Sequence, residues 1–206
     1  THRAQQLRIC QQGKVAFVTG SNHGIGAATA KRLATDGVAV LVTFLRGRVT
    51  SDPGTPERYQ RNRMTDGEEV AAGIRAAGGR AVAIEADLLD PVVPSRLFDL
   101  AETELGPVDI LVNNATGFFS GDSFTAGITD PVGRAAPAVS AELFDRTFGV
   151  DARAGAMMIA EFSRRLIERN GSWGRIVGLT SGSVNGFPSS GFTTATWSRS
   201  TLASSS

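Results

Sequence analysis

Short apolar runs alternate with longer amphipathic or Ala-rich stretches along most of this chain. Runs rich in Val, Ile and Leu are typical of strands buried on both faces, whereas an apolar period near 3.6 residues indicates a helix. The predicted strands are 15–19, 39–44, 80–86, 108–113 and 175–180, and the predicted helices are 26–36, 66–77, 91–104 and 140–170. This alternation predicts an α/β fold with a doubly wound parallel sheet. Right-handed crossovers give the strand order 3-2-1-4-5, so ligands are expected at the carboxyl ends of strands 1 and 4.

Residues with known end preferences mark the predicted helix boundaries. Gly37 follows the first helix and Gly78 the second, where glycine often ends a helix in the left-handed conformation. Asp90 and Ser140 are expected to cap the third and fourth helices, because their side-chain oxygens can accept hydrogen bonds from first-turn amides. Pro91 would then open the third helix.

Two connections and the end of the chain lack the alternation. The segment 46–65 is polar and basic, and 114–139 carries Gly and Pro; loops of this length are uncommon unless they serve a function. Most residues of 189–206 are Ser or Thr, without an apolar period, which predicts a low-complexity tail. We therefore expect one dinucleotide-binding domain over 1–188, followed by this tail.

The composition limits the kind of protein. The length of 206 residues suits one domain, and 41% hydrophobic and 20% charged residues exclude a disordered chain. No apolar run is long enough to span a membrane, and a net charge of +1 gives no reason to expect a nucleic-acid partner. The one cysteine, Cys10, excludes an internal disulfide and a Cys-rich metal site. Without a secretion signal a cytoplasmic location is expected, and Thr1 in place of Met indicates a processed, partial or arbitrary start.

A glycine-rich segment joins the first predicted strand to the first predicted helix. Its spacing is Gly-x-x-x-Gly-x-Gly, and such glycines let the backbone approach a diphosphate while the helix start stabilises the negative charge. The bare alternative is a tight strand-to-helix turn without a ligand. The candidate cofactor-binding residues of this phosphate loop are Gly20, Ser21, Asn22, His23, Gly24, Ile25 and Gly26.

The end of the second strand indicates which dinucleotide is preferred. A free ribose 2′-hydroxyl usually meets an Asp or Glu there, but no acidic residue lies between Asp36 and Asp52. Arg46 and Arg48 follow the strand instead, with His23 in the phosphate loop, and guanidinium groups suit a 2′-phosphate. The sequence therefore favours NADP(H) over NAD(H); the alternative is that both arginines are only solvated.

Further motifs follow strands 3 and 4. Asp87-Leu88 and Asn113-Asn114-Ala115, together with the phosphate loop, resemble the short-chain dehydrogenase/reductase family, closest to its 3-oxoacyl-acyl-carrier-protein reductase-like members, over about 14–188. The resemblance implies that Asp87 hydrogen-bonds the adenine, that Leu88 lies beside it, and that Asn114 and Ala115 line the cofactor. Thr116 stands where the family usually has Gly. From the residues alone, the paired asparagines could equally satisfy local backbone groups.

The resemblance also implies catalytic positions. Ser181 matches the family's catalytic Ser after strand 5, which would hydrogen-bond the substrate carbonyl and the developing oxyanion; alternatively its hydroxyl only terminates a strand. Asp151 stands where an Asn often completes the family's proton relay, and pairing with Arg153 or solvent is equally consistent with the sequence.

The tyrosine that serves as proton donor in the family is missing at its expected position. The family uses Tyr-x-x-x-Lys about 12 or 13 residues after the Ser, where the ammonium lowers the pKa of the phenol. The corresponding residues are Thr193 or Thr194 and Trp197 or Ser198, none of which can take that role. Tyr59 and Arg63 have the spacing but lie in the connection after strand 2, in the wrong part of this topology.

These observations lead to one main interpretation and two alternatives. We expect an NADP(H)-dependent oxidoreductase that acts on a small-molecule carbonyl or secondary alcohol, with impaired chemistry in a truncated or frame-shifted chain whose strand 5 is an open sheet edge. The alternatives are an NADP(H)-binding pseudoenzyme or regulatory module and a fragment that does not fold stably. Phe118, Phe119 and Phe124 could line a substrate pocket or belong to the core, and a homo-oligomer is left open.

Overall fold

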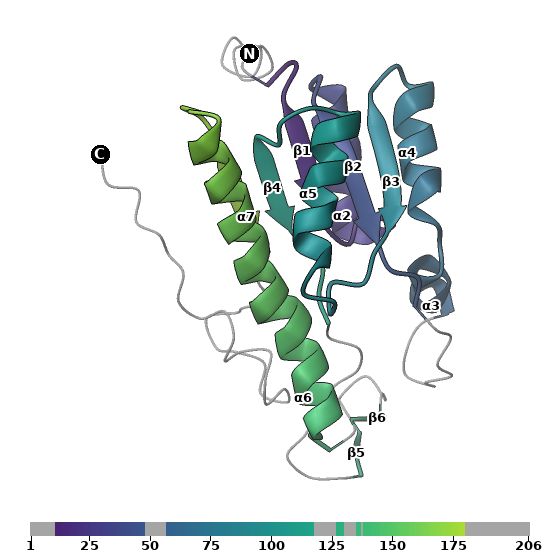
Figure 1. The fold of residues 1–206 in the computed structure, drawn as a ribbon. Coiled ribbons are helices and arrows are strands. Elements are labelled where there is room, and N and C mark those ends of the chain that lie inside the picture. Colours follow the sequence, from purple (N-terminus) through teal and green to yellow (C-terminus); the bar gives the residue numbers. More distant parts are fainter. Residues whose placement is uncertain (1–10, 48–56, 118–126, 130–134, 137, 180–206) are drawn as a thin grey trace, which may run out of the picture.

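A five-stranded parallel sheet forms the centre of the molecule (Figure 1). The computed structural model describes residues 11–47, 57–117, 127–129, 135–136 and 138–179. The strands are β1 (Val15–Val18), β2 (Ala39–Phe44), β3 (Ala81–Glu85), β4 (Ile110–Asn113) and β7 (Arg175–Gly178), in the order β3-β2-β1-β4-β7. All neighbours in this sheet pair in parallel. This confirms the predicted doubly wound α/β fold and its strand order.

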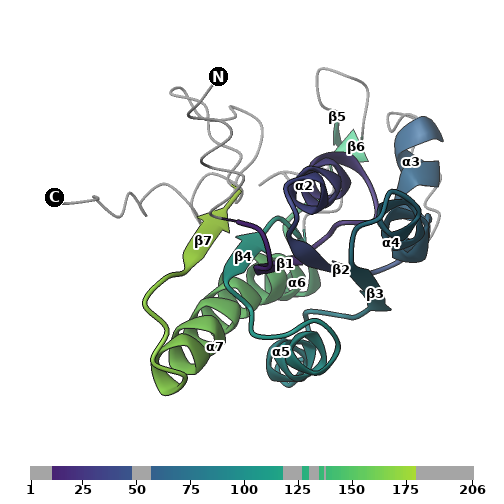
Figure 2. The ribbon, with the colours of Figure 1, turned by 90° about the horizontal axis from the view of Figure 1, so that it is seen from above.

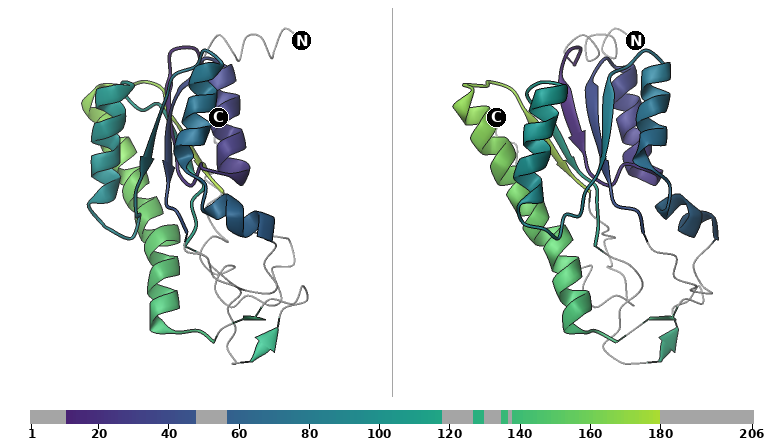
Figure 3. Two further views of the ribbon diagram at one scale, coloured as in Figure 1. Left: turned by 90° about the vertical axis from the view of Figure 1, so that its right-hand side faces the viewer. Right: turned by 45° about the vertical axis from the view of Figure 1, so that its right-hand side comes forward.

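Helices cover both faces of the sheet (Figures 2 and 3). Helices α2 (Gly24–Thr35) and α4 (Gly67–Ala76) lie on one face, and α5 (Val93–Glu104) and α7 (Gly155–Glu168) lie on the other. Helix α6 (Ala141–Phe148) continues through a π-helical segment, η1 (Gly149–Ala154), into α7. The predicted long helix from Ser140 is therefore present, with a π-helical segment inside it.

The core has two parts, one under each helical layer. Val18, Val40 and Val42 point to α2 and α4, whereas Phe17 and Leu41 point to α5 and α7. All residues of β1 and β2 are buried, which explains why these strands are apolar at every position instead of every second one.

Some boundaries differ from the predictions. The connection 46–65 contains helix α3 (Glu57–Arg63), which lacks an apolar stripe and so gives no periodic signal in the sequence. The connection 114–139 contains a short antiparallel pair, β5 (Ile128–Thr129) and β6 (Ala135–Ala136). Helix α5 begins at Val93, because the Asp90 side chain accepts from the Val92 amide in a turn before the helix and does not cap it.

Other local signals were predicted correctly. Ser140 caps α6 as predicted, because its side chain accepts from the Leu143 amide. Asp66, predicted only as the start of the second helix, caps α4 by accepting from the Glu68 amide. Gly37 follows α2 with a positive φ of 85°.

The tail predicted over 189–206 lies outside the described residues. Within the part of the chain that the structure describes, no helix is long and apolar enough to cross a membrane.

Candidate functional site

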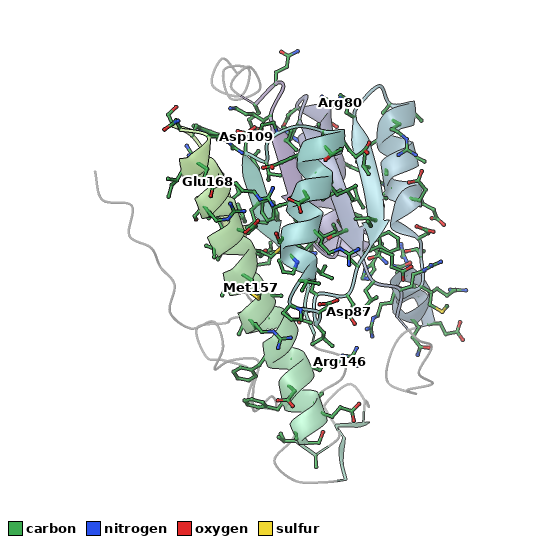
Figure 4. The ribbon with its side chains drawn as sticks, in the orientation of Figure 1. Arg80, Asp87, Asp109, Arg146, Met157 and Glu168 are labelled. Atoms are coloured by element: carbon green, nitrogen blue, oxygen red, sulfur yellow. The ribbon has the colours of Figure 1, made fainter. Side chains whose placement is uncertain are left out.

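The carboxyl ends of the strands meet at one edge of the sheet, and most of the predicted cofactor residues lie there. Asp87, after β3, lies at this edge together with Arg146, whereas Arg80 and Asp109, which precede β3 and β4, lie at the opposite edge (Figure 4). The strand order reverses between β1 and β4 at the same edge. This is the place where doubly wound sheets bind their ligands.

The phosphate loop presents an uncapped helix start. No side-chain hydrogen bond caps α2, and its first turn contains no acidic residue. Gly24 has a φ of 57°, and a Cβ added to it would meet nothing within 4 Å. Ile25, next to it, is 65% exposed. The first amides of α2 therefore lie beside open space at the positive end of the helix, which fits a diphosphate.

The same loop is packed too tightly for larger residues on its inner side. A Cβ on Gly26 would lie 2.3 Å from the Gly20 carbonyl oxygen and 2.6 Å from Asn114 Nδ2. The side chain of Ser21 is buried and donates to the Val18 carbonyl at 2.8 Å. Ser21 therefore holds the loop in shape, and its hydroxyl does not face a ligand.

Asn114 connects the loop after β4 to the phosphate loop. Its Nδ2 donates to the carbonyls of Thr19 at 2.9 Å and Gly20 at 2.8 Å. Thr19 Oγ1 in turn accepts from the backbone amides of Asn114 and Ala115 at 3.0 and 2.9 Å. The side chain of Asn114 thus satisfies carbonyls of the segment that follows β1, which is not the local role considered in the sequence.

Arg46 lies at the end of β2 as predicted, but its guanidinium is already paired. Nε and Nη2 donate to Glu85 Oε2, Nε at 2.9 Å, and the Arg46 backbone amide donates to Glu85 Oε1 at 3.0 Å. These hydrogen bonds lower the pKa of Glu85 and raise that of Arg46. The end of β2 itself carries no acidic residue. The parallel register places Glu85, the last residue of β3, opposite Phe44 and so supplies a carboxylate from the neighbouring strand.

His23 lies in the phosphate loop, directly before α2. Partial burial, followed by the charge of Arg63, lowers its pKa from the ordinary value of 6.5. Its imidazole is therefore neutral at pH 7, and it can offer a ligand hydrogen bonds but no positive charge.

Asp87 lines a cavity of about 950 Å³ between the loop after β3 and the helix α6–η1. Its Oδ1 accepts from the Leu89 amide at 2.9 Å, and Leu88 packs partly against the core. Other residues around this cavity are Leu45, Leu89, Arg146, Gly149 and Arg153.

Asp151 is a buried carboxylate at the far side of the site, in η1. It accepts from Gly117 N at 2.6 Å and from Thr116 Oγ1 at 3.0 Å, while Arg153 donates instead to the Leu89 carbonyl. Neither the pairing with Arg153 nor the solvent exposure considered in the sequence is therefore correct. Burial raises the pKa of Asp151 above its ordinary value, against the opposing effect of the two hydrogen bonds. Thr116 and Asp151, which both depart from the family pattern, thus contact each other.

Some predicted site residues cannot be placed. Ser181, Arg48, Phe118, Phe119 and Phe124 lie outside the described residues, as do Thr193, Thr194, Trp197 and Ser198.

Several curated proteins are similar to this chain in sequence. A curated relative is the NADPH-dependent aldehyde reductase-like protein of Arabidopsis thaliana, 35% identical over 82% of this chain and 56% of its own length. An uncharacterized oxidoreductase of Methylorubrum extorquens is 39% identical over 50% of this chain and 36% of its own length. The chain thus spans between about a third and three fifths of the curated relatives that it matches.

The solved structures that are similar to this chain include dehydrogenases and reductases. A short-chain dehydrogenase of Burkholderia cenocepacia J2315 in complex with NADP is 37% identical, with a TM-score of 0.60 over 83% of this chain and 56% of that one. A 3-oxoacyl (acyl-carrier-protein) reductase of Agrobacterium tumefaciens C58 with NADP bound is 26% identical, with a TM-score of 0.63 over 86% of this chain and 57% of that one. The family model for short chain dehydrogenases matches residues 59–195. The chain therefore belongs to the short-chain dehydrogenase family, as the resemblance of its motifs predicted.

Proposed function

We propose that this chain binds NADP(H) as the cofactor part of an oxidoreductase that acts on a small-molecule carbonyl or secondary alcohol. The observation that carries the proposal is the uncapped start of α2 beside the open space at Gly24. The amides of the phosphate loop would hold the diphosphate, and Asn114 and Ala115 would line the cofactor. Bound NADPH supplies a hydride, which no side chain can donate.

The adenosine end of the cofactor is proposed to lie toward β2 and β3. Asp87 and Leu88 would contact the adenine, since Asp87 already lines the cavity beside this edge. Arg46 would meet the 2′-phosphate. Preference for NADP(H) over NAD(H) is supported by the absence of an acidic residue at the end of β2 and by relatives whose names or structures include NADPH or NADP.

The reacting end of the site is proposed from the family alone. Ser181 would donate a hydrogen bond to the substrate oxygen and stabilise the negative charge that develops there. A 3-oxoacyl type of substrate is supported by the similarity to the Agrobacterium tumefaciens reductase. Turnover is proposed to be impaired, because Thr193 or Thr194 stands at the position of the family's Tyr and neither can replace a phenol as proton donor.

Calorimetric titration of the purified chain with NADPH and NADH tests the cofactor assignment. We expect saturable binding of one dinucleotide per chain, tighter for NADPH than for NADH, and a thermal melt shifted upward by NADPH. Absence of binding to a chain that melts cooperatively would overturn the proposal.

A second candidate function is a binding module without turnover. It is favoured by the residues at positions 193–198, where the family's Tyr and Lys are replaced. NADPH oxidation with a panel of ketones separates the two candidates: measurable turnover supports the oxidoreductase, whereas tight NADPH binding without turnover supports the module.

A further inference from the structure

We propose that Arg63, on helix α3, is a second binding residue for the 2′-phosphate of NADP(H). The inference rests on the proposed function and adds Arg63 to it, a residue that the sequence pattern does not link to the cofactor. It also gives α3 a role, namely to carry a guanidinium to the end of β2.

Two groups of contacts fix the position of Arg63. The first group joins Arg63 to Gly47 at the end of β2. The Gly47 amide donates to the Arg63 carbonyl at 3.1 Å. The Arg63 guanidinium lies directly over Gly47, because a Cβ added to that glycine would meet Nε at 3.4 Å and Cζ and Nη2 at 3.5 Å. Arg63 is therefore adjacent to Arg46, at the place where the residue that reads the ribose usually lies.

The second group of contacts joins the turn after α3 to the phosphate loop. Asn22 Nδ2 donates to the Thr65 carbonyl at 2.9 Å, and Thr65 Oγ1 donates back to the Asn22 carbonyl at 3.4 Å. The charge of Arg63 is one of the two causes that lower the pKa of His23. The turn after α3 is thus attached to the phosphate loop, and the half-buried Arg63 acts electrostatically on a residue of that loop.

The charges around Arg46 explain why a second cation matters. Arg46 pairs with Glu85, its Nη1 lies 4.0 Å from Asp66 Oδ2, and its side chain is 53% exposed. Its charge is therefore largely offset and partly screened by solvent. A 2′-phosphate carries close to two negative charges at pH 7, so a second, partly buried guanidinium next to Arg46 would add a positive charge for its oxygens.

The test compares Arg63→Gln with Arg61→Gln, a control on the same helix whose arginine is exposed. The full chain is titrated calorimetrically with NADP+ and with NAD+. One charged hydrogen-bond pair is worth about 1.5–3 kcal/mol, so Arg63→Gln is expected to weaken NADP+ binding about tenfold or more. NAD+ binding should stay within about twofold of the parent, and the control should leave both affinities unchanged.

Three outcomes would overturn the proposal: no change in NADP+ affinity, equal weakening for both dinucleotides, or the same loss in Arg61→Gln. Equal weakening would mean that Arg63 supports the loop or the diphosphate and does not read the 2′-phosphate. If Arg63→Gln fails to fold, Arg63→Lys replaces it; this variant keeps the charge but loses the planar fork, so an intermediate, NADP+-selective loss is expected. A parent chain that binds neither dinucleotide refutes the proposed function itself, whereas NADP+ preference unaffected by Arg63→Gln refutes only this inference.

Discussion

Strands β2 and β7 are both apolar members of the same parallel sheet, but their surroundings differ. Each residue of β2 is buried, because β1 and β3 pair with it on both sides and helices cover both faces. All residues of β7 are exposed, including Ile176 at 41% and Val177 at 47%, and within the described residues β7 pairs only with β4. The predicted exposed edge at strand 5 is therefore present in the part of the chain that the structure describes.

The difference separates the two ends of the proposed site. The phosphate loop follows a buried strand and is connected to its neighbours by Ser21 and Asn114. Ser181, by contrast, follows β7, whose apolar residues contribute less burial. Cofactor binding should therefore tolerate changes at β7 that would be destructive at β2.

The largest contrast is expected between truncations in the two strands. Leu41→Ala should lower the free energy of unfolding by about 2–5 kcal/mol, because it leaves a cavity at a site with no exposed surface. Val177→Ala should cost less than about 1 kcal/mol, since roughly half of that side chain already contacts solvent. Urea unfolding measures both. Equal costs would contradict the comparison and show that β7 is covered in solution.

Two glycine substitutions compare a tightly packed position of the phosphate loop with an open position on helix α4. Gly26→Ala places a methyl group 2.3 Å from the Gly20 carbonyl oxygen and should cost about 3 kcal/mol, with loss of NADPH binding. Gly73→Ala is the matched control in α4, where a Cβ would meet nothing within 4 Å. The control should be stabilised by about 0.5–1 kcal/mol through helix propensity. Thermal melts with and without NADPH measure both, and a well-folded Gly26→Ala variant that still binds NADPH would contradict the packing described above.

Removal of the Asn114 amide tests the connection between β4 and the phosphate loop. Asn114→Ala leaves the Thr19 and Gly20 carbonyls without that donor and should cost about 1–3 kcal/mol. NADPH affinity should fall together with stability, because the loop loses its support. A variant that loses affinity but keeps full stability would assign Asn114 to direct contact with the cofactor instead.

The smallest effect is expected for Asp151→Asn and depends on pH. Because burial raises the folded-state pKa of Asp151 above 3.8, ionisation of this group costs stability as the pH rises through that pKa. Asparagine is uncharged; its Oδ1 can still accept from Gly117 N, and its Nδ2 can donate to Thr116 Oγ1 in place of the bond that Asp151 accepts. The variant should therefore melt higher than the parent at pH 7. The difference should disappear toward pH 3.8 and below, where the parent carboxyl is protonated in both states. A lower melting temperature at pH 7 would mean that the ionised carboxylate stabilises η1.

The sequence predicted where most of the proposed cofactor residues lie in the fold, because the signals for their positions are local. The phosphate loop, Asp87 and Asn114 follow directly after strands, and the topology brings such positions to one edge. The sequence predicted that Arg46 follows β2, but it did not predict the ion pair with Glu85. Glu85 is 39 residues away in the chain, and only the register between β2 and β3 shows that the two meet.

What the sequence by itself determined was the set of strands and helices, their order in the sheet and the glycine turn between β1 and α2. These depend on the period of apolar residues and on the backbone freedom of glycine, which are properties of neighbouring residues. Only the tertiary structure decided that Glu85 pairs with Arg46, that Thr116 meets Asp151 in a π-helical segment, and that α3 carries Arg63 to the end of β2. Such contacts join residues distant in the chain, so they depend on register and packing, which no local pattern records.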